Sequence, residues 1–202
     1  MQAEYAIEVG GDAPALELPW ASDDGAVRYF DLRTRPELLL EIAEAQRFRE
    51  LGEFLAIVNS PTSLLGTAKC DVWATHELSE EEAAFGASLK LASYVDLVFA
   101  HAGRTSLPQH EEFARAICGL LSKAPEIPSA AEFVIRRCYF HDAAAGARPG
   151  PPRADSDDGY CITFYLAGYA DDEADARQRW TIGLKLVQNA ILQLAPRSSA
   201  AG

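Results

Sequence analysis

Segments with the period of a β-strand and segments with the period of an α-helix follow one another along this chain in a fixed order. Two strand-like segments precede a helix-like segment in each of three stretches, residues 3–59, 67–124 and 131–195. The clearest helix is the last one, in which Trp180, Leu184 and Val187 begin a series with steps of four and three residues. The order predicts an α+β fold, an antiparallel sheet with helices on one face, and it is compatible with three successive ββα units.

The length of 202 residues predicts one domain, which we place at residues 1–196, followed by a flexible C-terminal tail at 197–202. Residues 141–159 are rich in proline, glycine and aspartate, so we expect a long hairpin loop there, either flexible or ordered by a partner. A capping-box pattern at Thr34 and Glu37 predicts a helical region that ends near Val58. The expected strands are residues 4–9, 27–32, 68–76, 91–100, 133–140 and 160–169, and a further extended piece is expected at residues 15–20.

The charge balance limits the partners that this chain can have. Thirty acidic residues stand against 18 basic ones, a net charge of −12. Such a surface repels nucleic-acid backbones and anionic membranes, and no apolar run reaches the 18 or so residues that span a bilayer. A basic protein partner or a cation suits this field, although solubility alone also accounts for it.

Known catalytic and metal-binding motifs are absent from the sequence. Cys70, Cys118, Cys138 and Cys161 have no CxxC spacing and sit in apolar stretches, as buried free thiols do. The four histidines have no metal-ligand spacing, so no metal and no cofactor are expected. The N-terminus lacks the pattern of a signal peptide, which favours a cytoplasmic location. The residues leave open whether the chain is an enzyme.

The most informative surface is the face of the sheet that helices would not cover. Strand alternation places Lys69, Asp71 and Trp73 on one side of their strand, and Tyr94 and Asp96 on one side of the next. Strand 133–140 adds Arg136 or Arg137, depending on its register. The candidate binding residues are Lys69, Asp71, Trp73, Tyr94, Asp96, Arg136, Thr163 and Tyr165. Mixed aromatic and charged side chains are typical of binding surfaces, and they also occur on ordinary solvated sheets.

Three hypotheses about function follow from this surface. The leading one is a cytoplasmic binding protein that uses its acidic surface and the aromatic, charged sheet face, for example an inhibitor or immunity-type protein for a basic partner. The alternative is a small enzyme or small-molecule-binding domain with a pocket on the same face and residues 141–159 as its lid. A homodimer formed through this face is the third.

Overall fold

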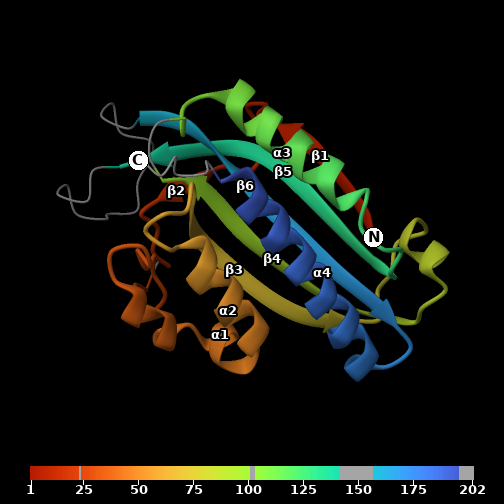
Figure 1. Ribbon diagram of the computed structural model, residues 1–202. Helices are drawn as coiled ribbons and strands as arrows, with labels where there is room; N and C mark the ends of the chain where they lie inside the picture. Colours follow the sequence, from red (N-terminus) through yellow and green to blue (C-terminus); the bar gives the residue numbers. More distant parts are fainter. Residues whose placement is uncertain (23, 101–102, 142–156, 196–202) are drawn as a thin grey trace, which may run out of the picture.

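The chain folds into an α+β structure around one mixed, mostly antiparallel sheet (Figure 1). The computed structural model describes residues 1–22, 24–100, 103–141 and 157–195. Within the described ranges, no helix is long and apolar enough to cross a membrane. The expected tail at 197–202 and most of the expected loop, residues 142–156, lie outside these ranges.

Five strands follow one another across the sheet, and a sixth, short strand extends one edge. Neighbouring strands are antiparallel except at the edge formed by β1 and β2, which both run parallel to β5. The strands, in the order in which they lie across the sheet, are β1 (Gln2–Glu8), β5 (Ser129–Phe140), β6 (Asp157–Ala170), β4 (Leu89–Phe99) and β3 (Leu65–Thr75), with β2 (Leu16–Leu18) beside β5.

The parallel edge corrects the prediction of an antiparallel sheet. β1 pairs with residues 130–136 of β5, and β2 pairs with residues 138–140 of the same strand. The two short strands are therefore successive pieces of one edge, and residues 9–15 leave the sheet between them. We had expected the Gly10-Gly11 turn to separate two ordinary strands of an antiparallel sheet. Parallel pairing depends on β5, more than a hundred residues away, and no local signal records it.

The first stretch of the chain also differs from the other two. The expected strand at 27–32 is wrong, because only an isolated bridge between Ala21 and Arg28 forms there. β3–β4 and β5–β6 are antiparallel pairs of consecutive strands, each followed by a helix, whereas β1 and β2 do not pair with each other. Three equivalent ββα units are therefore not confirmed.

Figure 1 shows α2, α3 and α4 in front of the strands. The predicted helical region before Val58 is divided into three pieces, and the Thr34 hydroxyl bonds to Asp31 Oδ2 at 2.8 Å instead of capping a helix. The helices are η1 (Pro36–Glu41), α1 (Ala43–Arg47), α2 (Arg49–Val58), η2 (Glu82–Phe85), α3 (Leu107–Leu121) and α4 (Glu173–Leu194).

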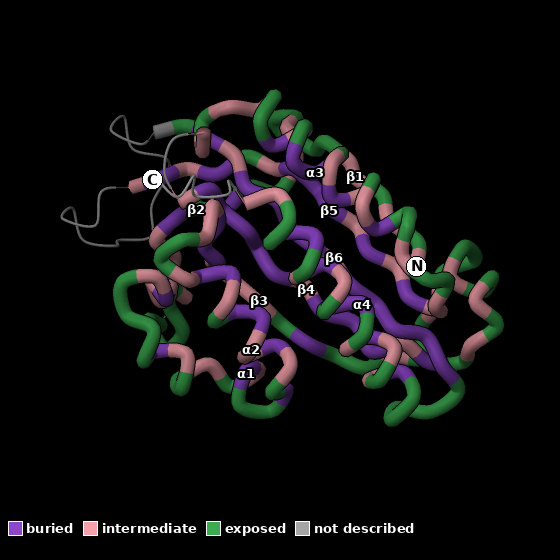
Figure 2. The backbone as a smooth tube through the Cα atoms, in the orientation of Figure 1, coloured by how far each residue is buried: buried purple, intermediate pink, exposed green. Residues whose placement is uncertain are grey.

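The main core lies between these helices and the sheet, where Figure 2 shows continuous buried backbone along the central strands. Trp180 of α4 is fully buried, and its indole N–H donates to the Ser93 hydroxyl of β4 at 2.8 Å. Phe133 and Phe164 stack in the same core, with ring centres 5.1 Å apart. Burying side chains of this size stabilises a fold by roughly 1.5–3 kcal/mol each.

The opposite side of the sheet, here called the second face, carries the alternate residues of each strand. Two small clusters cover its ends. At one end Leu16, Leu18 and Trp20 pack near Cys138 and Cys161. At the other end Phe85 stacks on Tyr169, with ring centres 4.2 Å apart. The middle of the second face, between these two clusters, holds the candidate site.

Replacing Gly168 of β6 with alanine should destabilise the protein by about 1–3 kcal/mol, because α4 lies directly on this glycine. A Cβ atom at Gly168 would stand 2.3 Å from the Trp180 amide nitrogen and 2.4 Å from the Ala176 oxygen. Urea unfolding measures the loss. Gly119→Ala is the matched control, since nothing lies within 4 Å of its Cβ position in α3. In the Gly119→Ala control the free energy of unfolding should rise by roughly 0.5–1 kcal/mol. Equal changes in the two variants would show that the close approach of α4 to Gly168 does not restrict this position.

Candidate functional site

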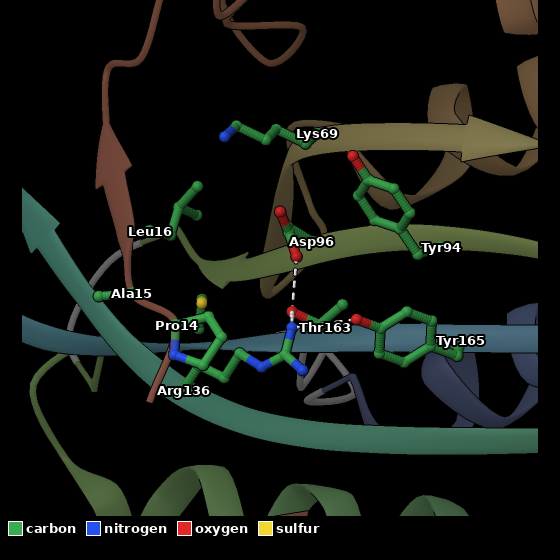
Figure 3. Close-up of a pocket in the computed structure, with 10 residues that line it drawn as sticks. Pro14, Ala15, Leu16, Lys69, Tyr94, Asp96, Arg136, Thr163 and Tyr165 are labelled. Atoms are coloured by element: carbon green, nitrogen blue, oxygen red, sulfur yellow. Dashed lines mark hydrogen bonds between the residues drawn. The ribbon is translucent and has the colours of Figure 1, made fainter. Parts of the chain in front are cut away.

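A hollow of about 200 Å³ opens on the second face, at the end where residues 9–15 leave the sheet. Six of the eight candidate residues line it, together with Cys161 and the Pro14–Leu16 segment that approaches β2 (Figure 3). The six are Lys69, Tyr94, Asp96, Arg136, Thr163 and Tyr165. The alternation of the strands thus brings together side chains that are far apart in the sequence.

Arg136 organises one wall of the hollow. Its Nη1 donates to the Tyr165 hydroxyl at 3.0 Å and to Thr163 Oγ1 at 3.4 Å. Its Nε and Nη2 donate to Glu8 Oε2 of β1 at 3.3 and 3.2 Å. The guanidinium is therefore held by four hydrogen bonds, and its charge is balanced by the Glu8 carboxylate.

Asp96 is the buried carboxylate of the site, with only 7% of its surface exposed. Its Oδ1 accepts a hydrogen bond of 2.7 Å from the Thr163 hydroxyl, which Figure 3 marks. Burial raises the pKa of Asp96, and this effect outweighs the Thr163 hydrogen bond and the charges of Lys69 and Arg136, which lower it. The buried, charged form of Asp96 therefore lowers the stability of the folded protein.

The second oxygen of Asp96 is available to a ligand. Within the described part of the chain, Oδ2 has no hydrogen-bond partner. No fully buried side-chain nitrogen or oxygen in the same part lacks a partner, so Oδ2 is not sealed from solvent. In Figure 3 this oxygen points away from Thr163 into the space between Lys69 and Tyr94. Asp96 Oδ2 is therefore a hydrogen-bond acceptor in the hollow to which no described group donates.

A row of aromatic rings runs across the strands beside Asp96. Trp73 of β3 lies 6.4 Å from Tyr94 of β4, and Tyr94 lies 6.2 Å from Tyr165 of β6, between ring centres. We call Trp73, Tyr94 and Tyr165 the aromatic row. Trp73 at its outer end is 38% exposed. Such neighbouring rings offer a large apolar contact with little loss of side-chain entropy on binding.

Charged groups of both signs act on the aromatic row: two carboxylates act on Tyr94, and the Arg136 guanidinium lies 5.6 Å from the centre of the Tyr165 ring. The pKa of Tyr94 is raised to about 12, first by burial and then by the carboxylates of Asp96 and Asp71. Asp71 is exposed and is paired in register with Tyr94 on the neighbouring strand. A cation near these rings would gain from both carboxylates and from the π faces.

Lys69 forms the far rim of the hollow. The register of β3 against β4 shifts between Thr67 and Cys70, so Lys69 lies in an irregular step of the strand. Its ammonium group stands 4.7 Å from the centre of the Trp20 ring, and the Trp20 indole donates to Ala68 O at 2.9 Å. Lys69 thus packs against the N-terminal segment.

A second and larger hollow, of about 770 Å³, lies on the other side of the aromatic row. Trp73 and Tyr165 line it from the row, and Glu4 and Glu132 line it from β1 and β5. The pKa of Glu132 is raised by burial and then by the nearby charges of Glu4 and Glu8. Acidic groups therefore continue along the second face beyond the first hollow.

Sequence reasoning missed three contributors to the site. Glu8, which balances Arg136, and the Pro14–Leu16 wall depend on the pairing of β1 and β2 with β5. Trp20, which holds Lys69, lies in a segment with no regular strand after Leu18. The register also decides between the two arginines, because Arg136 reaches the hollow whereas Arg137 donates to Val9 O at 2.8 Å.

The described residues contain no group of three histidine, cysteine, aspartate or glutamate side chains that could hold a metal ion. The four cysteines are free thiols. The expectation that residues 141–159 form a lid falls mainly on residues outside the described ranges. Comparison with known proteins adds no assignment, since no family model, no curated protein and no solved structure matches the chain.

Replacing Asp96 with asparagine should stabilise the protein at neutral pH. The folded protein binds the Asp96 proton more tightly than the unfolded chain does, so the carboxylate lowers stability as the pH rises above its ordinary pKa of 3.8. Asparagine carries no charge and still accepts from Thr163. Urea unfolding across pH should therefore show a gain that disappears below pH 3.8. Asp12→Asn, at an exposed turn, is the control; a loss of stability in Asp96→Asn at neutral pH would contradict the raised pKa of Asp96.

Proposed function

We propose that this protein is a non-catalytic binding protein whose second face contacts a basic protein partner. The observation that carries the proposal is the aromatic row, flanked by the hollow that holds Asp96 and by the larger hollow that holds Glu4 and Glu132. Aromatic side chains at the centre of a surface and charged groups around them are the composition of binding hot spots.

The charges of the second face favour a basic partner. Its carboxylates outnumber its unpaired cations, since Arg136 is bonded to Glu8 and Lys90 to Glu82 at 2.7 Å. The net charge of −12 extends the same field over the whole chain and would speed the approach of a basic protein. The carboxylates of this face without an ion pair are Glu4, Asp71, Asp96 and Glu132.

An inhibitor or immunity-type role in the cytoplasm is the form of this function that we favour. A protein that blocks a basic toxin or enzyme needs a preformed, electrostatically complementary surface and no catalytic group. The free thiols of all four cysteines are compatible with a reducing compartment.

Replacing Trp73 with alanine should weaken the binding of a basic probe about tenfold or more, because truncated aromatic hot spots cost about 2 kcal/mol. The probe is a 12-residue peptide of alternating arginine and glycine, and calorimetry at physiological salt measures its affinity. Leu192→Ala removes another exposed apolar side chain, from α4, and serves as the matched control. No saturable binding by the unmodified protein, or an equal loss in both variants, would overturn the proposal.

The hollow around Asp96 supports a second candidate function, a small-molecule-binding domain or enzyme. A buried carboxylate beside lysine and tyrosine side chains is also found in pockets for metabolites. Saturation with the right ligand, at 100 times its Kd, would stabilise the fold by about 2.7 kcal/mol. Stabilisation by a neutral metabolite that competes with the peptide would favour this alternative.

Homodimerisation through the second face is tested by native mass spectrometry. A basic partner requires this face to be free, so we expect a monomer whose mass is unaffected by Trp73→Ala. A dimer that becomes a monomer in the Trp73→Ala variant would assign the aromatic row to self-association instead.

A further inference from the structure

We infer that the hollow at Asp96 receives a single cationic side chain, an arginine or lysine of the partner, whose charged end meets Asp96 Oδ2. The inference rests on the proposed function and adds the chemical group that the site recognises. In this arrangement the rings of Tyr94 and Tyr165 contact the aliphatic stem of that side chain and lie against its charged group.

The free oxygen of Asp96 is held in a fixed position at the hollow. Asp96 is buried except where Oδ2 meets the hollow, and Thr163 fixes the carboxylate through Oδ1 at 2.7 Å. Thr163 in turn accepts from Arg136, which Glu8 holds in place. The free oxygen is therefore preorganised, so little ordering entropy remains to be lost when a donor binds.

An anionic ligand is disfavoured in the hollow, although Lys69 and Arg136 line it and lower the pKa of Asp96. Arg136 already donates four hydrogen bonds within the protein and shares its charge with Glu8. Lys69 packs over Trp20 at the rim. An anion in the hollow would lie beside Asp96 and close to Asp71, whose charges also act on Tyr94. A cation with several hydrogen-bond donors would compensate for the buried negative charge of Asp96, whereas an anion would be repelled by it.

The size of the hollow fits a single side chain. A hollow of about 200 Å³ is smaller than the roughly 300–1,000 Å³ of typical sites for small organic ligands. One long side chain fits such a volume, and the open side of the hollow leaves the backbone of the partner on the surface. The rings of Tyr94 and Tyr165 lie 6.2 Å apart, and Figure 3 shows Tyr165 extending toward Thr163, so a stem could follow the two rings to the carboxylate.

The test compares two small ligands that differ in charge and little in shape. N-acetyl-arginine amide and its neutral citrulline analogue are titrated into the isotopically labelled protein, followed by NMR. We expect saturable shifts at Tyr94, Asp96 and Thr163 with the arginine ligand, with a Kd of about 1 mM, and affinity at least tenfold weaker for citrulline. N-acetyl-lysine amide should follow the arginine ligand, since the shared feature is the cation.

Asp96→Asn should weaken the binding of N-acetyl-arginine amide at least tenfold, whereas Glu112→Gln should leave its affinity unchanged. Glu112 is exposed on α3, so the control removes the same net charge away from the hollow. Tyr94→Leu is a second variant, which keeps the Asp96 carboxylate and removes the aromatic ring. It should weaken the binding of the arginine ligand severalfold. Spectra of each variant without ligand show whether it is folded.

The outcomes separate the two proposals. If the arginine–glycine peptide binds with Trp73-dependent affinity but Asp96→Asn and Glu112→Gln behave alike, the function stands and the inference is wrong. If the peptide does not bind at all, the proposed function is wrong. Equal binding of the citrulline and arginine ligands, or shifts confined to surfaces outside the hollow, would also overturn the inference.

Discussion

The contact between α4 and β6 at Gly168 is the constraint on which the rest of the structure depends. Without a side chain at this position, the backbone of α4 lies directly on the sheet, and Trp180 reaches through the core to the Ser93 hydroxyl. The helix thereby fixes which side of β4 and β6 faces the core. Because strand residues alternate, the same contact directs Tyr94 and Thr163 to the second face.

The interruption of the β1–β2 edge turns that face into a site. β1 ends after Glu8, and the chain pairs with β5 again only at Leu16, so residues 9–15 interrupt the edge row of the sheet, and Pro14 and Ala15 line the hollow. Glu8, the last residue before the interruption, anchors Arg136. Irregular strand edges commonly reposition side chains near functional sites, and here the irregularity gives the hollow one wall and an ordered arginine.

The buried carboxylate of Asp96 lowers the stability of the fold and is suited to binding a cation. A purely structural carboxylate would gain from an ion pair, whereas Asp96 has a hydrogen bond from Thr163 and a raised pKa. Stability and function oppose each other at such positions, since an apolar or neutral residue would be easier to bury. A bound cation would compensate for the buried charge, which links the electrostatics of the hollow to the proposed partner.

The sequence by itself determined the local features of this protein, namely the α+β class, the long C-terminal helix, and the alternation that groups Tyr94 with Asp96 and Thr163 with Tyr165. These features depend on residues a few positions apart, which is the range over which strand and helix periods act. Only the tertiary structure decided the parallel edge, the choice of Arg136 over Arg137, and the contribution of Glu8. Those depend on pairing between segments more than a hundred residues apart, and the free energy that selects the pairing comes from burial in the assembled core rather than from any local pattern.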